Sequence, residues 1–144
     1  SRQQFAKMMV KTLGMTPTGQ EVNPFRDVSG PQGTDPFYPE KYVAVCSAAG
    51  IIQGYPGGLF KPDDPTKRMQ LITMVTRAAQ LPAPAAEVVP PFGVFDGTHY
   101  PFARSAYGAG LLAGLVGMGP DYPFLGPASR GECARLLANL LHTR

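Results

Sequence analysis

An internal repeat constrains the fold more than any other feature of this chain. Three segments share one pattern, in which an arginine in the second position is followed by apolar residues spaced 3, 4 and 8 positions beyond the first apolar residue: SRQQFAKMMVKTL (1–13), KRMQLITMVTRAA (67–79) and SRGECARLLANLL (129–141). This spacing is that of one face of an α-helix. A helix repeated in this way predicts a tandem-repeat architecture.

The starts of these helices share their chemistry. Ser1 and Ser129 are each followed three residues later by Gln or Glu, which predicts a capping box at the start of the first and third helices. In the middle copy Lys67 takes the place of the serine. That lysine either adds a positive charge or marks a helix whose cap has shifted to Thr66.

A second pattern precedes the last two of these helices. It predicts a short helix that ends at Gly50 in one copy and at Gly110 in the other, where a left-handed C-cap residue belongs. Before each short helix an aspartate follows an aromatic residue: Asp27 in FRDV and Asp96 in FDG. An aspartate there is expected to cap a turn or the helix that follows.

These patterns together predict a single mainly α-helical module over residues 1–144, built of tandem helix–loop–helix repeats. Only the last helix of a first repeat is present, so we expect the protein to extend upstream of Ser1. The connector LPAPAAEVVPPF (81–92) is expected to be extended. The expected divisions are 1–14 for the end of repeat one, 15–81 for repeat two and 82–144 for a degenerate repeat three.

Composition excludes several classes of function. Lys and Arg total 13 and Asp and Glu total 10, and the positive charges are dispersed, so no nucleic-acid partner is expected. No apolar run is long enough for a membrane span. Cys46 and Cys133 lie in apolar helical patterns and are expected to be buried free thiols rather than a disulfide.

Motifs of catalytic and metal sites are also missing. The glycine loop GYPGG (54–58) is not followed by the Gly-Lys-Ser/Thr of a phosphate-binding loop. His99 and His142 lie far apart without neighbouring ligands, and Asp63-Asp64 before a proline does not match an EF-hand loop. We therefore expect no enzyme activity, no cofactor and no metal site, although a pair of carboxylates assembled only in the fold is left open.

The segment FRDV…GIIQGYPGGLFKPDDPTKRMQ resembles the S-layer homology (SLH) domain. A repeat of that family has a Phe-x-Asp-Val start, a helix, a Gly-Ile-Ile/Val-x-Gly-Tyr-x-x-Gly-x-Phe-x-Pro loop and a Thr-Arg-Ala-Glu helix start. The second repeat carries most of these features in order. The third departs from them, because Leu115 replaces the loop tyrosine and the loop before Arg130 is longer.

The resemblance implies a pseudo-threefold helical bundle that holds an exported protein on the bacterial cell surface. Its expected partners are a cell-wall polysaccharide, often one that bears ketal-linked pyruvate, and upstream domains of the same polypeptide. It implies binding grooves near three arginines and contributions from the start of repeat two and its glycine loop: Arg2, Arg68, Arg130, Asp27, Gly54 and Tyr55, with Asp96 a weaker counterpart of Asp27.

The chemistry of such a site is consistent with these residues. The planar guanidinium of Arg68 can bind a pyruvyl carboxylate through two hydrogen bonds, and a helix N-terminus adds its dipole and free N–H groups. Lys67 adds a second positive charge, and Gly54 lets the backbone approach a ligand. The alternatives are an internal salt bridge for Arg68, packing over the loop for Tyr55 and a turn cap for Asp27.

An assembly module is the alternative function. In that case the helices pack only against other subunits or repeats, and no glycan site is present. Exposed apolar faces at 1–14 are then expected to pair two copies of the chain in a homo-oligomer.

Overall fold

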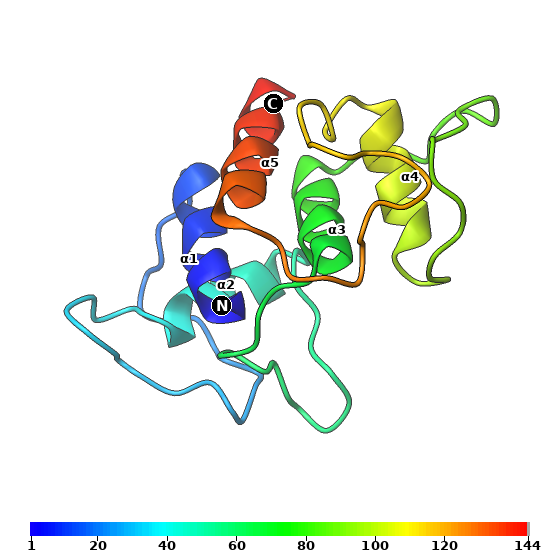
Figure 1. Cartoon of the computed structure of the whole chain (residues 1–144). Coiled ribbons are helices and arrows are strands. Elements are labelled where there is room, and N and C mark those ends of the chain that lie inside the picture. Colours follow the sequence, from blue (N-terminus) through cyan, green and yellow to red (C-terminus); the bar gives the residue numbers. More distant parts are fainter. Residues whose placement is uncertain (144) are drawn as a thin grey trace. The chain divides into compact units, whose positions relative to one another are not determined.

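The structure is a computed structural model that describes residues 1–143, and this part of the chain forms α-helices joined by long loops, without a β-strand (Figure 1). The prediction of a mainly α fold is confirmed. The chain divides into two compact units, Ser1–Pro65 (unit 1) and Thr66–Arg144 (unit 2). The repeat limits and the pseudo-threefold arrangement stay predictions. The helices are α1 (Arg2–Thr12), α2 (Glu40–Ala48), α3 (Arg68–Ala79), α4 (Tyr100–Gly108) and α5 (Arg130–His142).

Unit 1 is built on the packing of α1 against α2. The apolar stripe of α1 is buried, and the Cys46 thiol of α2 donates to the Ala6 carbonyl at 3.6 Å. The predicted capping box is confirmed, since Ser1 Oγ accepts from Gln4 N–H at 3.3 Å and the Gln4 side chain accepts from the N-terminal amine. Helix α1 is thereby fixed at the end that carries Arg2.

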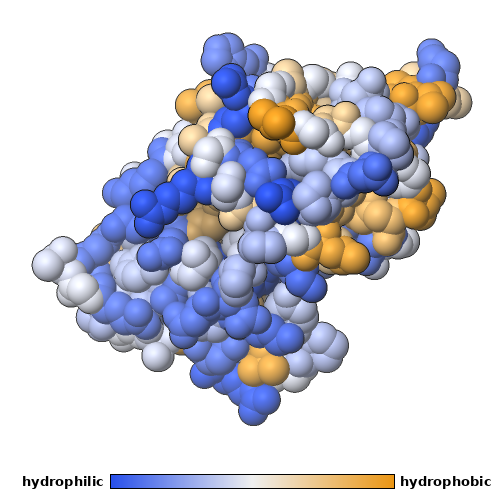
Figure 2. All heavy atoms as spheres, viewed as in Figure 1, coloured by the Kyte–Doolittle hydropathy of each residue, from blue (hydrophilic) through white to orange (hydrophobic). Residues whose placement is uncertain are grey.

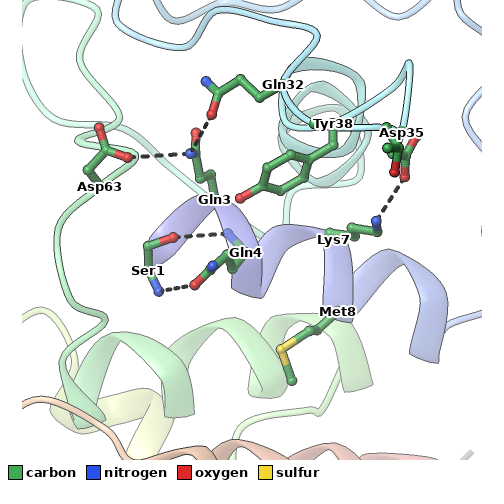
Figure 3. A pocket seen from close by; sticks show the side chains of 11 residues that line it. Ser1, Gln3, Gln4, Lys7, Met8, Gln32, Asp35, Tyr38 and Asp63 are labelled. Carbon is green, nitrogen blue, oxygen red and sulfur yellow. Dashed lines mark hydrogen bonds and ion pairs between the residues drawn. The ribbon is translucent and has the colours of Figure 1, made fainter.

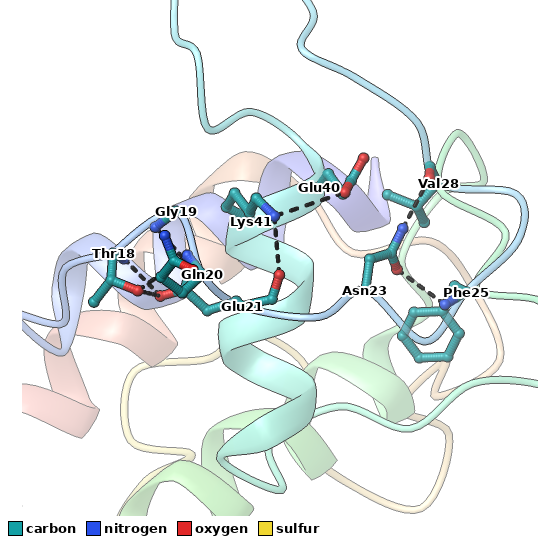
Figure 4. A network of polar contacts seen from close by, with 9 residues as sticks. All are labelled: Thr18, Gly19, Gln20, Glu21, Asn23, Phe25, Val28, Glu40 and Lys41. Atoms are coloured by element: carbon teal, nitrogen blue, oxygen red, sulfur yellow. Dashed lines mark hydrogen bonds and ion pairs between the residues drawn. The ribbon is translucent and has the colours of Figure 1, made fainter.

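The segment between α1 and α2 is ordered by short polar contacts (Figure 4). The Asn23 amide donates to the Val28 carbonyl and accepts from the Phe25 N–H, both at 2.9 Å. Lys41 of α2 donates to the Glu21 carbonyl at 2.9 Å. Asn23 therefore closes the Phe-Arg-Asp-Val turn on itself and sets the position of the aspartate within it.

Unit 2 places α3 against both α4 and α5. The Ser129 capping box of α5 is confirmed, because Ser129 Oγ accepts from Glu132 N–H and Glu132 Oε1 accepts from Ser129 N–H. Lys67 is the N-cap residue of α3, and its own N–H donates to Gln70 Oε1 at 3.0 Å. The Thr66 hydroxyl is buried without a hydrogen-bond partner, so the cap has not shifted to Thr66.

Glycines end the two short helices as predicted. Gly50 and Gly110 follow the C-caps of α2 and α4 with φ angles of +73° and +80°. These left-handed residues turn the chain so that the next apolar residue is buried. The connector at 81–92 is not helical, as predicted, and Arg104 of α4 holds it by donating to backbone carbonyls within residues 85–88.

The surface seen in Figure 2 is mainly hydrophilic, with hydrophobic residues in small separate groups. Both cysteines are free thiols, as predicted, but only Cys46 is buried, whereas Cys133 is half-buried. Among residues 1–143, no helix has the length and apolar character needed to cross a membrane, and no cluster of three potential metal ligands occurs.

Candidate ligand-binding sites

The same junction occurs in each unit, where the start of an arginine-bearing helix meets a loop that comes later in the chain. The first two N–H groups of α1 and of α3 donate to loop carbonyls: Arg2 to Asp64 and Gln3 to Pro62, both at 3.1 Å, and Arg68 to Gly126 and Met69 to Phe124, both at 2.9 Å. The expectation of free N–H groups at these helix starts is therefore corrected, because loop carbonyls take the donors that the helix leaves unpaired.

Arg2 is the centre of the junction in unit 1. Only 5% of Arg2 is exposed, and its Nε donates to the Phe60 carbonyl at 2.8 Å. Its guanidinium carbon lies 4.6 Å from the centre of the Phe60 ring and 5.2 Å from that of Tyr55. Burial lowers the pKa of Arg2, an effect that the nearby Tyr55 and Asp64 oppose. Arg2 thus anchors the 54–64 loop, and none of the described carboxylates forms an ion pair with it.

Two cations lie close to the Tyr55 ring. The Lys61 ammonium is 4.2 Å from the ring centre, and the Arg2 guanidinium also lies over this ring. Lys61 is exposed and has a φ of +59°, the left-handed conformation that few residues with a side chain adopt. Lys61 is not among the residues predicted from sequence, because nothing in the Lys-Pro-Asp-Asp-Pro segment indicates that the lysine folds back over Tyr55.

Asp27 is bound to the same loop. Its two carboxylate oxygens accept from the Phe60 and Lys61 N–H groups, both at 2.8 Å. Burial acts to raise the pKa of Asp27, but these two donors outweigh it and the pKa lies below its ordinary value. Asp27 therefore has the role of a cap, the alternative to ligand contact, although its target is a loop 33 residues away.

Gly54 has a structural reason to be a glycine. A Cβ atom added there would lie 2.3 Å from Phe25 Cε1 and 2.6 Å from the Leu59 carbonyl oxygen. The next residue, Tyr55, donates its N–H to the same Leu59 carbonyl at 2.6 Å. The Phe25 ring and the Leu59 carbonyl therefore require glycine at this position, and contact of Gly54 with a ligand stays a prediction.

Arg68 in unit 2 is paired with a carboxylate. Its Nε donates to Glu132 Oε2 at 2.8 Å, and its Nη1 donates to the Pro123 carbonyl at 3.3 Å. The Tyr122 hydroxyl donates to the same Glu132 oxygen at 2.7 Å. The guanidinium therefore lies in an internal salt bridge, which was the structural alternative to ligand contact.

The titration of these groups reflects the pairing. Burial acts to raise the pKa of Glu132, but hydrogen bonds from Arg68 and Tyr122 outweigh it and lower that pKa to about 2. The hydrogen bond to Glu132 raises the pKa of Arg68. Burial, and to a smaller extent the hydrogen bond to Glu132, raises the pKa of Tyr122. The salt bridge borders a groove of about 410 Å³ between the 114–116 segment and the start of α5. A carboxylate on a ligand would compete there with Glu132.

The other expected residues lie at the helix starts of unit 2. Lys67 is exposed at the N-cap of α3, and Arg130 is exposed at the first position of α5. Leu115, in the position of the loop tyrosine, is 8% exposed. Asp96 caps the turn that precedes α4, with its Oδ1 accepting from the Thr98 and His99 N–H groups at 2.7 and 2.8 Å. Unit 1 therefore gathers Arg2, Asp27, Gly54 and Tyr55 around one loop, and unit 2 gathers Arg68 with Tyr122 and Glu132.

Residues 24–72 match the family model described as the S-layer homology domain. This segment belongs to the S-layer homology family. The match includes Asp27, Gly54, Tyr55, Lys67 and Arg68, and SLH domains are binding modules that attach proteins to cell-wall polymers at the bacterial surface. No curated protein matches the chain.

Proposed function

We propose that this protein anchors a larger exported polypeptide to the bacterial cell wall by binding an anionic polysaccharide whose pyruvate ketals supply the charge. The SLH match over residues 24–72 supports wall anchoring. The observation that carries the anionic ligand is the placement of the Arg2 and Lys61 cations over the Tyr55 ring in unit 1.

Each of these three side chains has a part in the proposed site. Lys61 is exposed, so its ammonium can contact a carboxylate directly. Arg2 is held by Phe60 and adds a fixed positive charge beside the ring. Tyr55 presents a partly exposed aromatic surface on which the face of a sugar can pack. The site combines charge recognition with a sugar-binding wall.

The strength of one such site is limited. A hydrogen bond to a charged group contributes about 1.5–3 kcal/mol, and less where water competes. A repetitive polymer compensates because one bound unit raises the effective concentration of the next. In unit 2 Lys67 and Arg130 are exposed cations that attract the polymer, whereas Arg68 takes part only when a ligand carboxylate displaces Glu132.

The test is pelleting of the full chain with purified sacculi, before and after mild acid removes the pyruvyl groups. Lys61→Ala removes the exposed cation next to Tyr55, and Arg68→Ala tests the salt-bridged one. Lys11→Ala is a matched control, because Lys11 is an exposed lysine of unit 1 that lies beside Tyr42 and not Tyr55.

We expect acid treatment and Lys61→Ala each to lower the bound fraction, and Lys11→Ala to leave it unchanged. Arg68→Ala should have a smaller effect than Lys61→Ala, because the guanidinium is already paired. Equal pelleting of every variant on treated and untreated walls would refute the pyruvate proposal. Absence of pelleting on walls of the native organism would favour the assembly module.

One observation favours an assembly role for unit 2. Its arginine is internally paired, and the loops of this unit expose Val116 (90%) and Leu125 (62%). Pairing of two copies through α1 has less support, since Phe5, Met9 and Val10 are buried and only Met8 of its large apolar residues is exposed.

A further inference from the structure

A second polar groove lies in unit 1, on a different face of α1 from Arg2. It has a volume of about 740 Å³, within the usual range of small-molecule sites, and lies between the first turns of α1, the 32–38 loop and Asp63 (Figure 3). Consecutive residues of a helix point about 100° apart. Arg2 is therefore directed to the Tyr55 loop, while the next residue, Gln3, lines this groove.

Gln3 is buried without being satisfied. Only 5% of it is exposed, and its Oε1 accepts no hydrogen bond. Its Nε2 lies 3.5 Å from Gln32 Oε1 and 3.4 Å from Asp63 Oδ1, at the outer limit of a hydrogen bond. Rotating the amide by 180° would set its oxygen against these two acceptors. The buried Gln3 amide therefore lacks the stabilisation that hydrogen bonds of good geometry to its oxygen and its nitrogen would supply.

The residues around Gln3 indicate which class of ligand could form hydrogen bonds in this groove. Gln32 and Asp63 are both exposed, and each presents an oxygen that accepts hydrogen bonds. The one lysine of the groove, Lys7, is paired with Asp35 at 2.9 Å, so its charge is compensated. The Asp63 carboxylate would repel an anion, and the two cations that line the groove, Lys7 and the N-terminal amine, already bind Asp35 and the Gln4 side-chain oxygen. Neutral molecules with several hydroxyl groups suit these acceptors.

The groove also has an aromatic wall. Tyr38 lies between Gln3 and the Lys7–Asp35 pair, with the Lys7 ammonium 5.5 Å from its ring centre (Figure 3). The backbone of Tyr38 is fixed, because its carbonyl accepts from Gln32 N–H at 2.8 Å and its N–H donates to the Asp35 carbonyl at 3.1 Å. A rigid aromatic ring beside hydroxyl acceptors is suited to the apolar face of a sugar ring.

We propose that this groove binds a neutral carbohydrate, whose hydroxyl groups donate to the exposed Gln32 and Asp63 oxygens beside the Gln3 amide while a sugar face packs on Tyr38. It shares no residue with the Arg2, Lys61 and Tyr55 cluster, which is proposed for an anion. The protein would then contact both a charged and an uncharged part of a glycan, or two glycans.

The test is NMR titration of the full ¹⁵N-labelled chain with N-acetylglucosamine, methyl β-glucoside and sodium pyruvate. We expect the neutral sugars, at millimolar affinity, to shift the side-chain amides of Gln3 and Gln32 and the backbone of 32–38. Asp63→Ala should weaken this binding about fivefold or more, through loss of one charge-assisted hydrogen bond. Asp63 is exposed, so this change should preserve the fold.

Lys61→Ala is the matched control for this groove, because it weakens the proposed anion site and should leave the sugar-induced shifts unchanged. The proposal is overturned if neither sugar shifts these amides at about 100 mM, a concentration about a hundred times a Kd of about 1 mM. It is equally overturned if Asp63→Ala binds with unaltered affinity, or if pyruvate alone produces the shifts. Wall pelleting that depends on Lys61 but persists in Asp63→Ala would leave the proposed anchoring intact while this groove fails.

Discussion

Unit 1 and unit 2 share the junction between an arginine-bearing helix and a later loop, but different side chains bind the arginine in each. In both, an arginine opens a helix whose first N–H groups donate to a later loop. In unit 1 the arginine donates to a backbone carbonyl and lies over two aromatic rings, whereas in unit 2 it is neutralised by Glu132. The same junction is present in both units, but only the unit 1 arginine lacks an ion pair with a carboxylate among the described residues.

The two loops are also held differently. Asp27 reaches across to the Phe60 and Lys61 N–H groups in unit 1. Its counterpart Asp96 bonds only nearby residues and caps the turn before α4. The loop that carries Lys61 and Tyr55 is thus fixed by a carboxylate as well as by Arg2. We infer that unit 1 is pre-organised to present charge, and unit 2 is not.

The largest effect should come from the loop glycines. Gly54→Ala places a Cβ against Phe25 and the Leu59 carbonyl and should lower the free energy of unfolding by about 3 kcal/mol or more. Gly114→Ala is the matched change in unit 2. There φ is +82° and the nearest contact is the exposed, flexible Arg135 side chain, so a loss of about 1–2 kcal/mol is expected. Urea unfolding measures both, and equal losses would refute the difference in packing.

The next effect concerns the two aspartates. Asp27→Ala leaves two N–H groups of the 60–61 segment without their acceptor and should cost about 2 kcal/mol, together with weaker wall binding. Asp96→Ala removes the cap of the turn before α4 and should cost about 1 kcal/mol with no change in wall binding. Thermal unfolding and sacculus pelleting of both variants check this. A larger loss of binding in Asp96→Ala would contradict the assignment of the site to unit 1.

Some of this arrangement was predictable from sequence, and the limit has a physical reason. The serine caps, the C-cap glycines and the arginine positions depend on residues within a few places of each other, and local patterns indicate them. The contacts of Asp27 with Phe60 and of Arg68 with Glu132 span 33 and 64 residues. Such pairs arise from how loops pack on helices, so the repeat revealed equivalent positions but not their different partners.

The third effect is a pH dependence specific to unit 2. The pKa of Glu132 is about 2 in the folded chain and ordinarily 4.5, so its salt bridge stabilises the fold above pH 4.5 and this contribution is lost as the pH falls towards 2. Glu132→Gln lacks it. The stability difference between wild type and Glu132→Gln, about 1–2 kcal/mol at pH 6, should therefore shrink as the pH falls to 2. Denaturant unfolding across this range tests it, and a difference independent of pH would exclude an ionic pair.

The smallest expected effect tests whether Glu132 alone prevents Arg68 of unit 2 from binding a ligand carboxylate. Glu132→Gln removes the competing carboxylate from Arg68, and the glutamine can still accept from Ser129 N–H, so α5 should keep its cap. An uncompensated guanidinium beside the 410 Å³ groove should then gain affinity for a pyruvyl carboxylate. Because Leu115 offers no aromatic wall, we expect only about a two- to fivefold increase in pelleting on pyruvylated sacculi.

The gain in pelleting should vanish in the double variant Glu132→Gln/Arg68→Ala and on acid-treated walls. If Glu132→Gln binds no better than wild type, the pairing with Glu132 is not what distinguishes the two units, and the missing tyrosine becomes the better explanation.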